Sequence, residues 1–129
     1  MRVLAIDYGT ARCGCAISDP TGTLARPLAA VEPPDPAAIA ELASAEEADR
    51  VIVGLPTTLG GEEGEQAQLS RAFAEELAEL LDVPVETYDE RLTTRMADRS
   101  AREGARADRD SLAAAHLLES YLTWTSRAE

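Results

Sequence analysis

The sequence contains no lysine, so its 12 basic residues are all arginine. They are outnumbered by 24 acidic residues, and the formal net charge is -12. Strong non-specific nucleic-acid binding needs many cations that face phosphates, so this balance argues against it. Aromatic residues make up only 4% of the chain, and the core must therefore be built from leucine, valine, isoleucine and alanine. No apolar run reaches the roughly 18 residues of a membrane span, and the N-terminus lacks a signal-peptide pattern. We therefore expect a cytoplasmic protein.

Cysteine and histidine are too few for a zinc site of the usual kind. Cys13 and Cys15 lie two positions apart in a strand pattern, which puts them on one face but outside disulfide geometry. We interpret both as small core residues. The lone histidine, His116, lies six residues after Asp110, on another face of the same predicted helix, so we expect a structural role. We interpret Trp124, the sole tryptophan, as a packing residue near the C-terminus.

The length of the chain fits one compact domain over residues 1–129. Hydrophobic periodicity and turn residues predict strands at Arg2–Ile6, Cys13–Ser18, Thr23–Val31, Val51–Val53 (ending at Gly54) and Pro84–Tyr88. The first three are linked by tight turns and the last two are separated by helices. This order predicts a mixed five-stranded sheet flanked by helices, which is an α/β fold.

Four helices are predicted. Asp35 caps the first, which has Pro36 at its first position. Thr93 or Thr94 caps a helix lined by Arg91, Arg95, Arg99, Arg102 and Arg106. The long second helix and the last helix, which begins at Asp108 or Asp110, carry apolar stripes: Leu69, Phe73, Leu77, Leu80 and Leu81 on the former, and Leu112, Ala115, Leu118 and Leu122 on the latter.

Acidic residues stand at three element ends: Asp7 after the first strand, Asp89 and Glu90 after the last, and Asp110 at the start of the last helix. Carboxylates brought together from separate segments are the ligands that Mg²⁺ prefers, and two such ions can support phosphodiester hydrolysis. Each acid also has a simpler interpretation. Asp7 could form an Asx turn with Gly9, Glu90 could pair with Arg91 or Arg95 at the surface, and Asp110 could be a helix cap.

Four motifs in order resemble the YqgF/RuvX family. They are Asp7-Tyr8-Gly9-Thr10-Ala11-Arg12-Cys13-Gly14, Val53-Gly54-Leu55-Pro56, Asp89-Glu90-Arg91-Leu92-Thr93-Thr94, and Asp110-Ser111-Leu112-Ala113-Ala114 with Leu118-Glu119-Ser120-Tyr121-Leu122. The resemblance implies an RNase H-like fold related to the RuvC Holliday-junction resolvases. It also implies a metal-dependent nuclease that matures the 5′ end of 16S ribosomal RNA.

The resemblance also implies roles for single residues. Asp7, Glu90 and Asp110 would hold Mg²⁺ or Mn²⁺, and Asp89 would lie beside them. Neighbouring strand residues point to opposite faces, so only one of Asp89 and Glu90 is expected to be a direct ligand, and we favour Glu90. Candidate substrate contacts are Thr10, Arg12, Arg91 and Arg95.

Three departures from the family pattern bear on activity. Ala11 replaces a frequent lysine, Met96 replaces the acid of a capping box, and Ala113 stands where resolvases carry a further acid. The resemblance implies that the substrate is structured RNA, such as pre-ribosomal RNA, or branched DNA. The protein would act as a monomer or homodimer. The alternative is a non-catalytic module that binds nucleic acid or a ribosome-assembly partner.

Overall fold

The computed structural model describes residues 1–56, 64–89 and 109–128, without the side chains of 109–110 and 126–128. The elements in chain order are β1 (Val3–Tyr8), β2 (Cys13–Ser18), β3 (Ala25–Val31), α1 (Pro36–Ala45), β4 (Arg50–Leu55), α2 (Glu65–Leu80), β5 (Val85–Asp89) and α4 (Arg109–Ala128). No helix within these ranges is long and apolar enough to cross a membrane.

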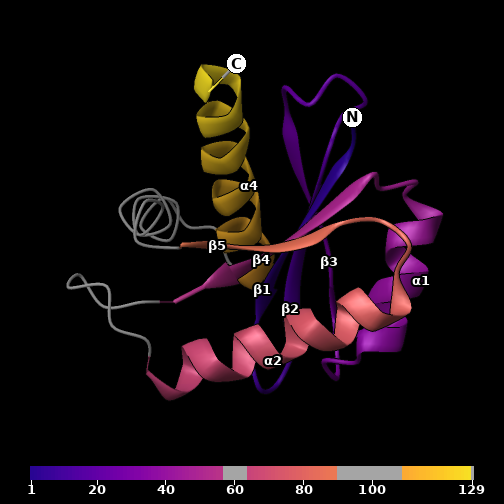
Figure 1. Ribbon diagram of the computed structural model, residues 1–129, viewed down its shortest axis with the longest axis vertical. Helices are drawn as coiled ribbons and strands as arrows, with labels where there is room; N and C mark the ends of the chain where they lie inside the picture. Colours follow the sequence, from indigo (N-terminus) through magenta and orange to yellow (C-terminus); the bar gives the residue numbers. More distant parts are fainter. Residues whose placement is uncertain (57–63, 90–108, 129) are drawn as a thin grey trace.

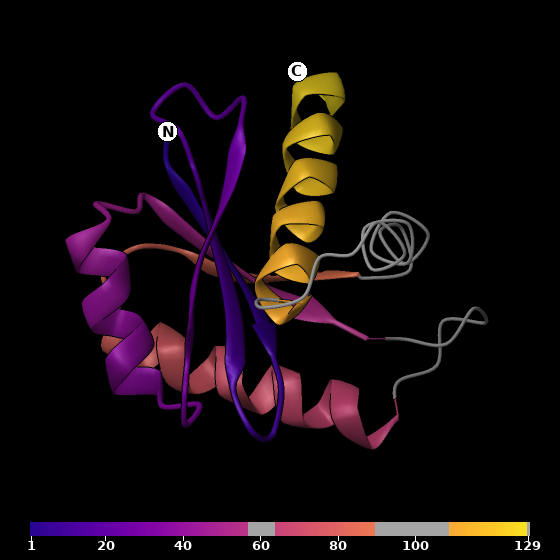
Figure 2. The same ribbon diagram turned by 180° about the vertical axis from the view of Figure 1, so that it is seen from behind.

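The strands form one five-stranded sheet in the order β3-β2-β1-β4-β5. β1, β2 and β3 pair antiparallel, whereas β4 and β5 run parallel to β1. The sheet lies between α4 on one side and α1 with α2 on the other (Figures 1 and 2). The mixed five-stranded sheet covered by helices is therefore confirmed.

Strand alternation divides the core into two layers. On β1, Leu4 and Ile6 face α1 and α2, whereas Val3 and Ala5 face α4. All four side chains are at most 1% exposed, because helices cover both faces of this central strand. The side of the sheet that a residue faces is thus fixed by its position along the strand, with a period of two.

Cys13–Ser18 has the predicted bounds, but other strand ends differ from prediction. β4 does not stop at Gly54, because Gly54 and Leu55 pair with Tyr88 and Asp89 of β5. β3 begins at Ala25 rather than Thr23, because the amides of Thr23 and Leu24 donate to the Asp19 carboxylate instead. Those hydrogen bonds lower the pKa of Asp19 to about 2, with the Thr21 hydroxyl as the largest cause.

The helices follow most of the predicted pattern. Asp35 caps α1 through a hydrogen bond from the Ala37 amide, as expected. The apolar stripe predicted for α2 is partly wrong, since Leu69 and Leu80 are 38% and 55% exposed. Small residues take their place. The buried positions are Ala67, Ser70, Phe73, Ala74 and Leu77. On α4, Ala115, Leu118 and Leu122 are buried and Leu112 is half-buried. The predicted arginine-lined helix lies outside the described residues.

A tight turn over residues 9–12 joins β1 to β2 just beyond Asp7. The Gly9 amide donates to the Arg12 carbonyl oxygen at 3.0 Å. A Cβ atom on Gly9 would lie 2.8 Å from that same oxygen, which is closer than real side chains approach. Glycine at position 9 is therefore required by the close approach of two backbone segments.

We expect Gly9→Ala to lower the free energy of unfolding by about 1–3 kcal/mol, because the turn must open to accept the methyl group. Urea denaturation followed by circular dichroism measures this. Gly64→Ala is the matched control, since a Cβ atom there meets nothing within 4 Å. A loss for Gly9→Ala no larger than that of the control would contradict the steric argument.

Candidate active site

Asp7 lies on the face of the sheet that α4 covers, and its neighbours on both sides are glycines. It shares the α4 face with Val3 and Ala5 by alternation, and it pairs with Gly14 of β2. On the other side, Ile6 pairs with Val53 of β4, so Gly54 occupies the next position of that register. Residues paired across strands point to the same face, with Cβ atoms about 4.5–5.5 Å apart. The residues directly opposite the half-buried Asp7 on both neighbouring strands are therefore glycines.

A hydrogen bond to β2 fixes the first turn of α4 close to these glycine positions. Ser111 is fully buried, and its hydroxyl accepts a hydrogen bond from the Cys15 amide at 3.2 Å. That amide lies at a β-bulge, where the pairing of β2 with β3 shifts between Cys13 and Cys15. α4 begins at Arg109, one residue from the predicted start at Asp108 or Asp110. Asp110, the residue before Ser111, therefore lies in the first turn of α4 over β2, the strand next to Asp7. Its side chain lies outside the described part of the protein.

Asp89 faces the other side of the sheet. It pairs with Leu55, which is buried, while Gly54 and Tyr88 form the preceding pair. Tyr88 packs against the core layer under α4, and alternation then turns Asp89 toward α2. Asp7 and Asp89 are thus on opposite faces of the sheet. Glu90, Arg91 and Arg95 lie outside the described residues.

The Asx turn considered for Asp7 does not account for this region, because the Gly9 amide that it would need donates to the Arg12 carbonyl. Thr10 is exposed in the turn. Arg12 forms an ion pair with Glu32 at 3.4 Å, and the two side chains are 46% and 64% exposed. Such exposed pairs contribute about 0–1 kcal/mol and exchange readily.

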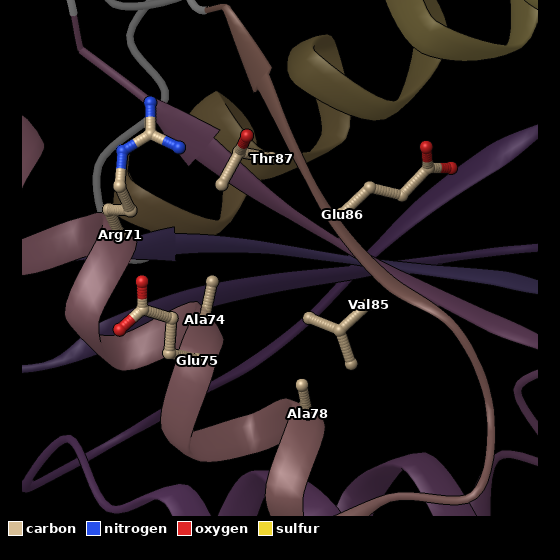
Figure 3. Close-up of a pocket in the computed structure, with 7 residues that line it drawn as sticks. All are labelled: Arg71, Ala74, Glu75, Ala78, Val85, Glu86 and Thr87. Carbon is tan, nitrogen blue, oxygen red and sulfur yellow. The ribbon is translucent and has the colours of Figure 1, made fainter.

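Two cavities lie elsewhere. A groove of about 370 Å³ runs between α2 and the edge strand β5, and Figure 3 shows Arg71, Glu75 and Thr87 along it, with Glu86 turned away. It lies on the face opposite Asp7. A second cavity of about 490 Å³ is lined by Met1, Arg50 and Tyr121, at the other end of β1. Among the residues whose side chains are described, no group of three possible metal ligands occurs; two of the predicted ligands lie outside that set.

The cysteines and the histidine keep the structural roles expected of them. Cys13 and Cys15 are buried and unbridged, on the face away from Asp7. Burial raises the pKa of the Cys13 thiol to about 12 and that of the Cys15 thiol to about 11, so both stay protonated and are poor metal ligands at neutral pH. His116 is half-buried and lies 3.6 Å from the Glu119 carboxylate.

Comparison with known proteins agrees with this arrangement. Residues 1–124 match the family model described as "RuvX: Holliday junction resolvase". The chain belongs to the RuvX family. The predicted family is therefore confirmed on nearly the whole length of the chain.

Curated relatives carry the name "Putative pre-16S rRNA nuclease". One from Rhodococcus erythropolis is 43% identical, with 98% of this chain and 80% of the relative covered. Another, from Anaeromyxobacter, is 42% identical, with 95% and 96% covered.

Solved structures share the fold at low sequence identity. Thermus thermophilus RuvC, in complex with a Holliday junction substrate, superimposes with a TM-score of 0.63 at 18% identity, covering 98% of this chain and 96% of RuvC. The fowlpox virus Holliday junction resolvase gives 0.58 at 13% identity, covering 96% and 99%. The RNase H-like fold predicted for this RuvX protein is confirmed.

Sequence reasoning missed the residues that shape the site without reacting. Gly54 was interpreted as a strand end and Ser111 as part of a motif without a role of its own. The signals were present: a glycine inside a strand marks a close approach or an open space, and a serine on the buried stripe of a helix needs a partner.

Ser111→Ala is expected to lower the free energy of unfolding by about 1–3 kcal/mol, because the buried Cys15 amide loses its acceptor. Ser70→Ala is the control: Ser70 is also buried, but its hydroxyl has no partner in the described part of the chain, so its removal should be neutral or stabilising. Chemical denaturation of both variants measures this. Equal losses would show that the Ser111 hydrogen bond contributes nothing.

Because burial raises the pKa of both thiols, we expect the free energy of unfolding to decline at alkaline pH. Between pH 9 and about 11 an unfolded thiol releases its proton, whereas the buried thiols retain theirs. The unfolded state then binds fewer protons, so the free energy of unfolding falls as pH rises. Urea titrations from pH 8 to 11 should show a shallower decline for Cys13→Ala/Cys15→Ala than for the parent. Tyrosine ionisation is common to both proteins, and parallel curves would refute the shift.

Proposed function

We propose that this chain is a metal-dependent endonuclease that hydrolyses phosphodiester bonds, with Asp7 as the central metal ligand. The observation that carries the proposal is the half-buried Asp7 carboxylate between two glycine positions, on the face where α4 begins. A half-buried carboxylate is stabilised by hydrogen bonds or by a cation that neutralises its charge. Glycine on both neighbouring strands means that no Cβ atom lies directly opposite Asp7.

Glu90 and Asp110 are the proposed partners of Asp7. Asp89 faces away from Asp7, so alternation favours Glu90 as the acid that β5 contributes. Asp110 precedes Ser111, whose anchor at Cys15 holds the start of α4 beside the Asp7–Gly14 pair. Three carboxylates fit Mg²⁺ or Mn²⁺, and a bound ion would activate water and neutralise charge at the phosphate. The protein itself contributes the fixed carboxylates and the open space between them.

We propose structured RNA, in particular precursor 16S ribosomal RNA, as the substrate. The names of relatives about 40% identical over most of the chain support RNA, and an RNA substrate of this kind would place the protein in the cytoplasm. Branched DNA is the second candidate, because RuvC shares the fold. Thr10 and Arg12 in the turn after Asp7, together with Arg91 and Arg95, are proposed to contact the backbone. Arg12 can exchange Glu32 for a phosphate at little cost.

A non-catalytic binding module is the alternative, and Ala113 favours it, since α4 offers no second acid one turn after Asp110. Calorimetric titration with Mn²⁺ separates the two. The nuclease requires ion binding that Asp7→Asn weakens, whereas the module requires none. Oligomeric state, monomer or homodimer, is open to sedimentation measurements.

Paired substitutions test the assignment of faces. Asp7→Asn should reduce Mn²⁺-dependent cleavage of a precursor 16S fragment by about 100-fold or more, as expected when a group that stabilises transition-state charge is lost. Asp89→Asn, which removes the same charge from the opposite face, should retain most activity. Initial rates at saturating metal measure both.

Urea denaturation of both variants serves as the folding control. Equal cleavage by Asp7→Asn and the parent would eliminate the proposed role of Asp7. A loss for Asp89→Asn as large as that for Asp7→Asn would instead show that Asp89, rather than Glu90, serves the site.

A further inference from the structure

Trp124, the sole tryptophan of the chain, is 56% exposed on α4. It rests against two tyrosines, with ring centroids 6.4 Å from Tyr88 and 6.4 Å from Tyr121. The expectation of a purely packing role therefore holds for only part of the ring. More than half of a large aromatic surface remains open to solvent, which is unusual for the largest apolar side chain in a protein.

The two supporting rings are held in place by their hydroxyl groups. Tyr121 donates to the Glu86 carboxylate at 2.6 Å and accepts from Arg50 at 2.9 Å. The Tyr88 hydroxyl is hydrogen-bonded to the Ser120 hydroxyl at 2.8 Å, and the two tyrosine rings meet edge to face at 5.5 Å. Trp124 thus lies on a fixed support, so that little freedom of the support is lost when something stacks on it.

One member of the aromatic cluster of Tyr88, Tyr121 and Trp124 lies in line with Asp7 across the sheet: this is Tyr88, whereas Tyr121 lies toward the other end of β1. Tyr88 pairs with Gly54, and Gly54 occupies the register position next to Asp7. Two strand spacings of about 4.8 Å separate Tyr88 from Asp7 along this row, or roughly 10 Å. The residue between them, Gly54, is buried and has no side chain, so no side chain of β4 separates Tyr88 from Asp7 along this row.

The helix gives a second, independent link. Asp110 and Trp124 are fourteen residues apart on α4, which is close to four full turns and about 21 Å along the axis. Their positions therefore lie on the same side of the helix. A short stretch of single-stranded nucleic acid can span this distance, whereas the exposed ring alone would not indicate a substrate contact.

We propose that Trp124 stacks on an unpaired base of the substrate and so positions a single-stranded segment a few nucleotides from the phosphate beside Asp7. The identity of the occupant rests on the proposed nuclease function. Stacking suits this chain because its net charge of -12 attracts phosphates poorly, and because Arg50, which contacts the cluster through Tyr121, is paired with Glu86. Aromatic stacking holds bases without relying on net charge. Substrates with unpaired segments are therefore preferred over continuous duplex.

The fluorescence of this sole tryptophan reports stacking directly. The full chain is titrated, without divalent ions and at low salt, with a single-stranded RNA of about a dozen nucleotides, with a blunt duplex of the same sequence, and with an abasic oligomer of equal length. We expect saturable quenching by the single strand and much weaker quenching by the other two. Quenching by the abasic oligomer equal to that by the RNA would overturn base stacking.

Variants separate recognition from folding. Trp124→Leu should weaken binding of the fluorescently labelled single strand by about tenfold, and Trp124→Phe should recover part of the loss. In cleavage assays Trp124→Leu should raise KM more than it lowers kcat. Leu80→Ala is the matched control, since Leu80 is 55% exposed on α2, and it should leave both readouts unchanged.

The inference and the proposed function fail separately. If Trp124→Leu binds and cleaves like the parent while Asp7→Asn does not cleave, Trp124 stacks on no base and the nuclease proposal stands. If neither the parent nor any variant cleaves, yet the single strand quenches Trp124 fluorescence and Trp124→Leu binds the strand less tightly, then stacking stands and the nuclease proposal is wrong.

Discussion

The central position of β1 constrains the rest of the structure. This strand pairs with β2 on one side and β4 on the other, and helices cover both of its faces. A shift of one residue would move Leu4 and Ile6 into the layer under α4 and expel Val3 and Ala5 from it. The packing that holds the fold together therefore also determines that Asp7 faces α4.

At the candidate site this packing is weaker, because glycines replace side chains on both strands next to Asp7. Along the α4 face, side chains of Ala5, Ala16 and Ile52 pack in the core under the helix, but Gly14 and Gly54, the buried positions on either side of Asp7, contribute no side chain. Glycines inside strands weaken them, since they lose more entropy and pack no side chain. The Ser111–Cys15 hydrogen bond offsets part of this cost, because it fixes the first turn of α4 on β2.

Much of the fold could be predicted because buried positions recur with the period of a strand or helix, as in Cys13–Ser18. The errors arise where contacts with residues far along the chain determine the end of a strand or the exposure of a side chain. Gly54 continues its strand because β5 pairs with it, and Leu80 is exposed because small residues of α2 pack more closely on the sheet. The acids could be assigned to element ends in advance. Whether Asp89 shares a face with Asp7 depends on the register of β5, which local sequence does not contain.

Charge explains how so acidic a chain can still be a candidate nuclease. The arginines on the described surface include three paired with glutamate: Arg12 with Glu32, Arg26 with Glu46, and Arg50 with Glu86. The pair of Arg12 is exposed on both sides and costs little to separate, whereas that of Arg50 is tied to Tyr121 through shared hydrogen bonds. In the proposed site a phosphate would displace the carboxylate from Arg12, while Arg50 holds Tyr121 of the aromatic cluster. Under this proposal the separation of one local ion pair, rather than the net charge of -12, would decide where a polyanion approaches.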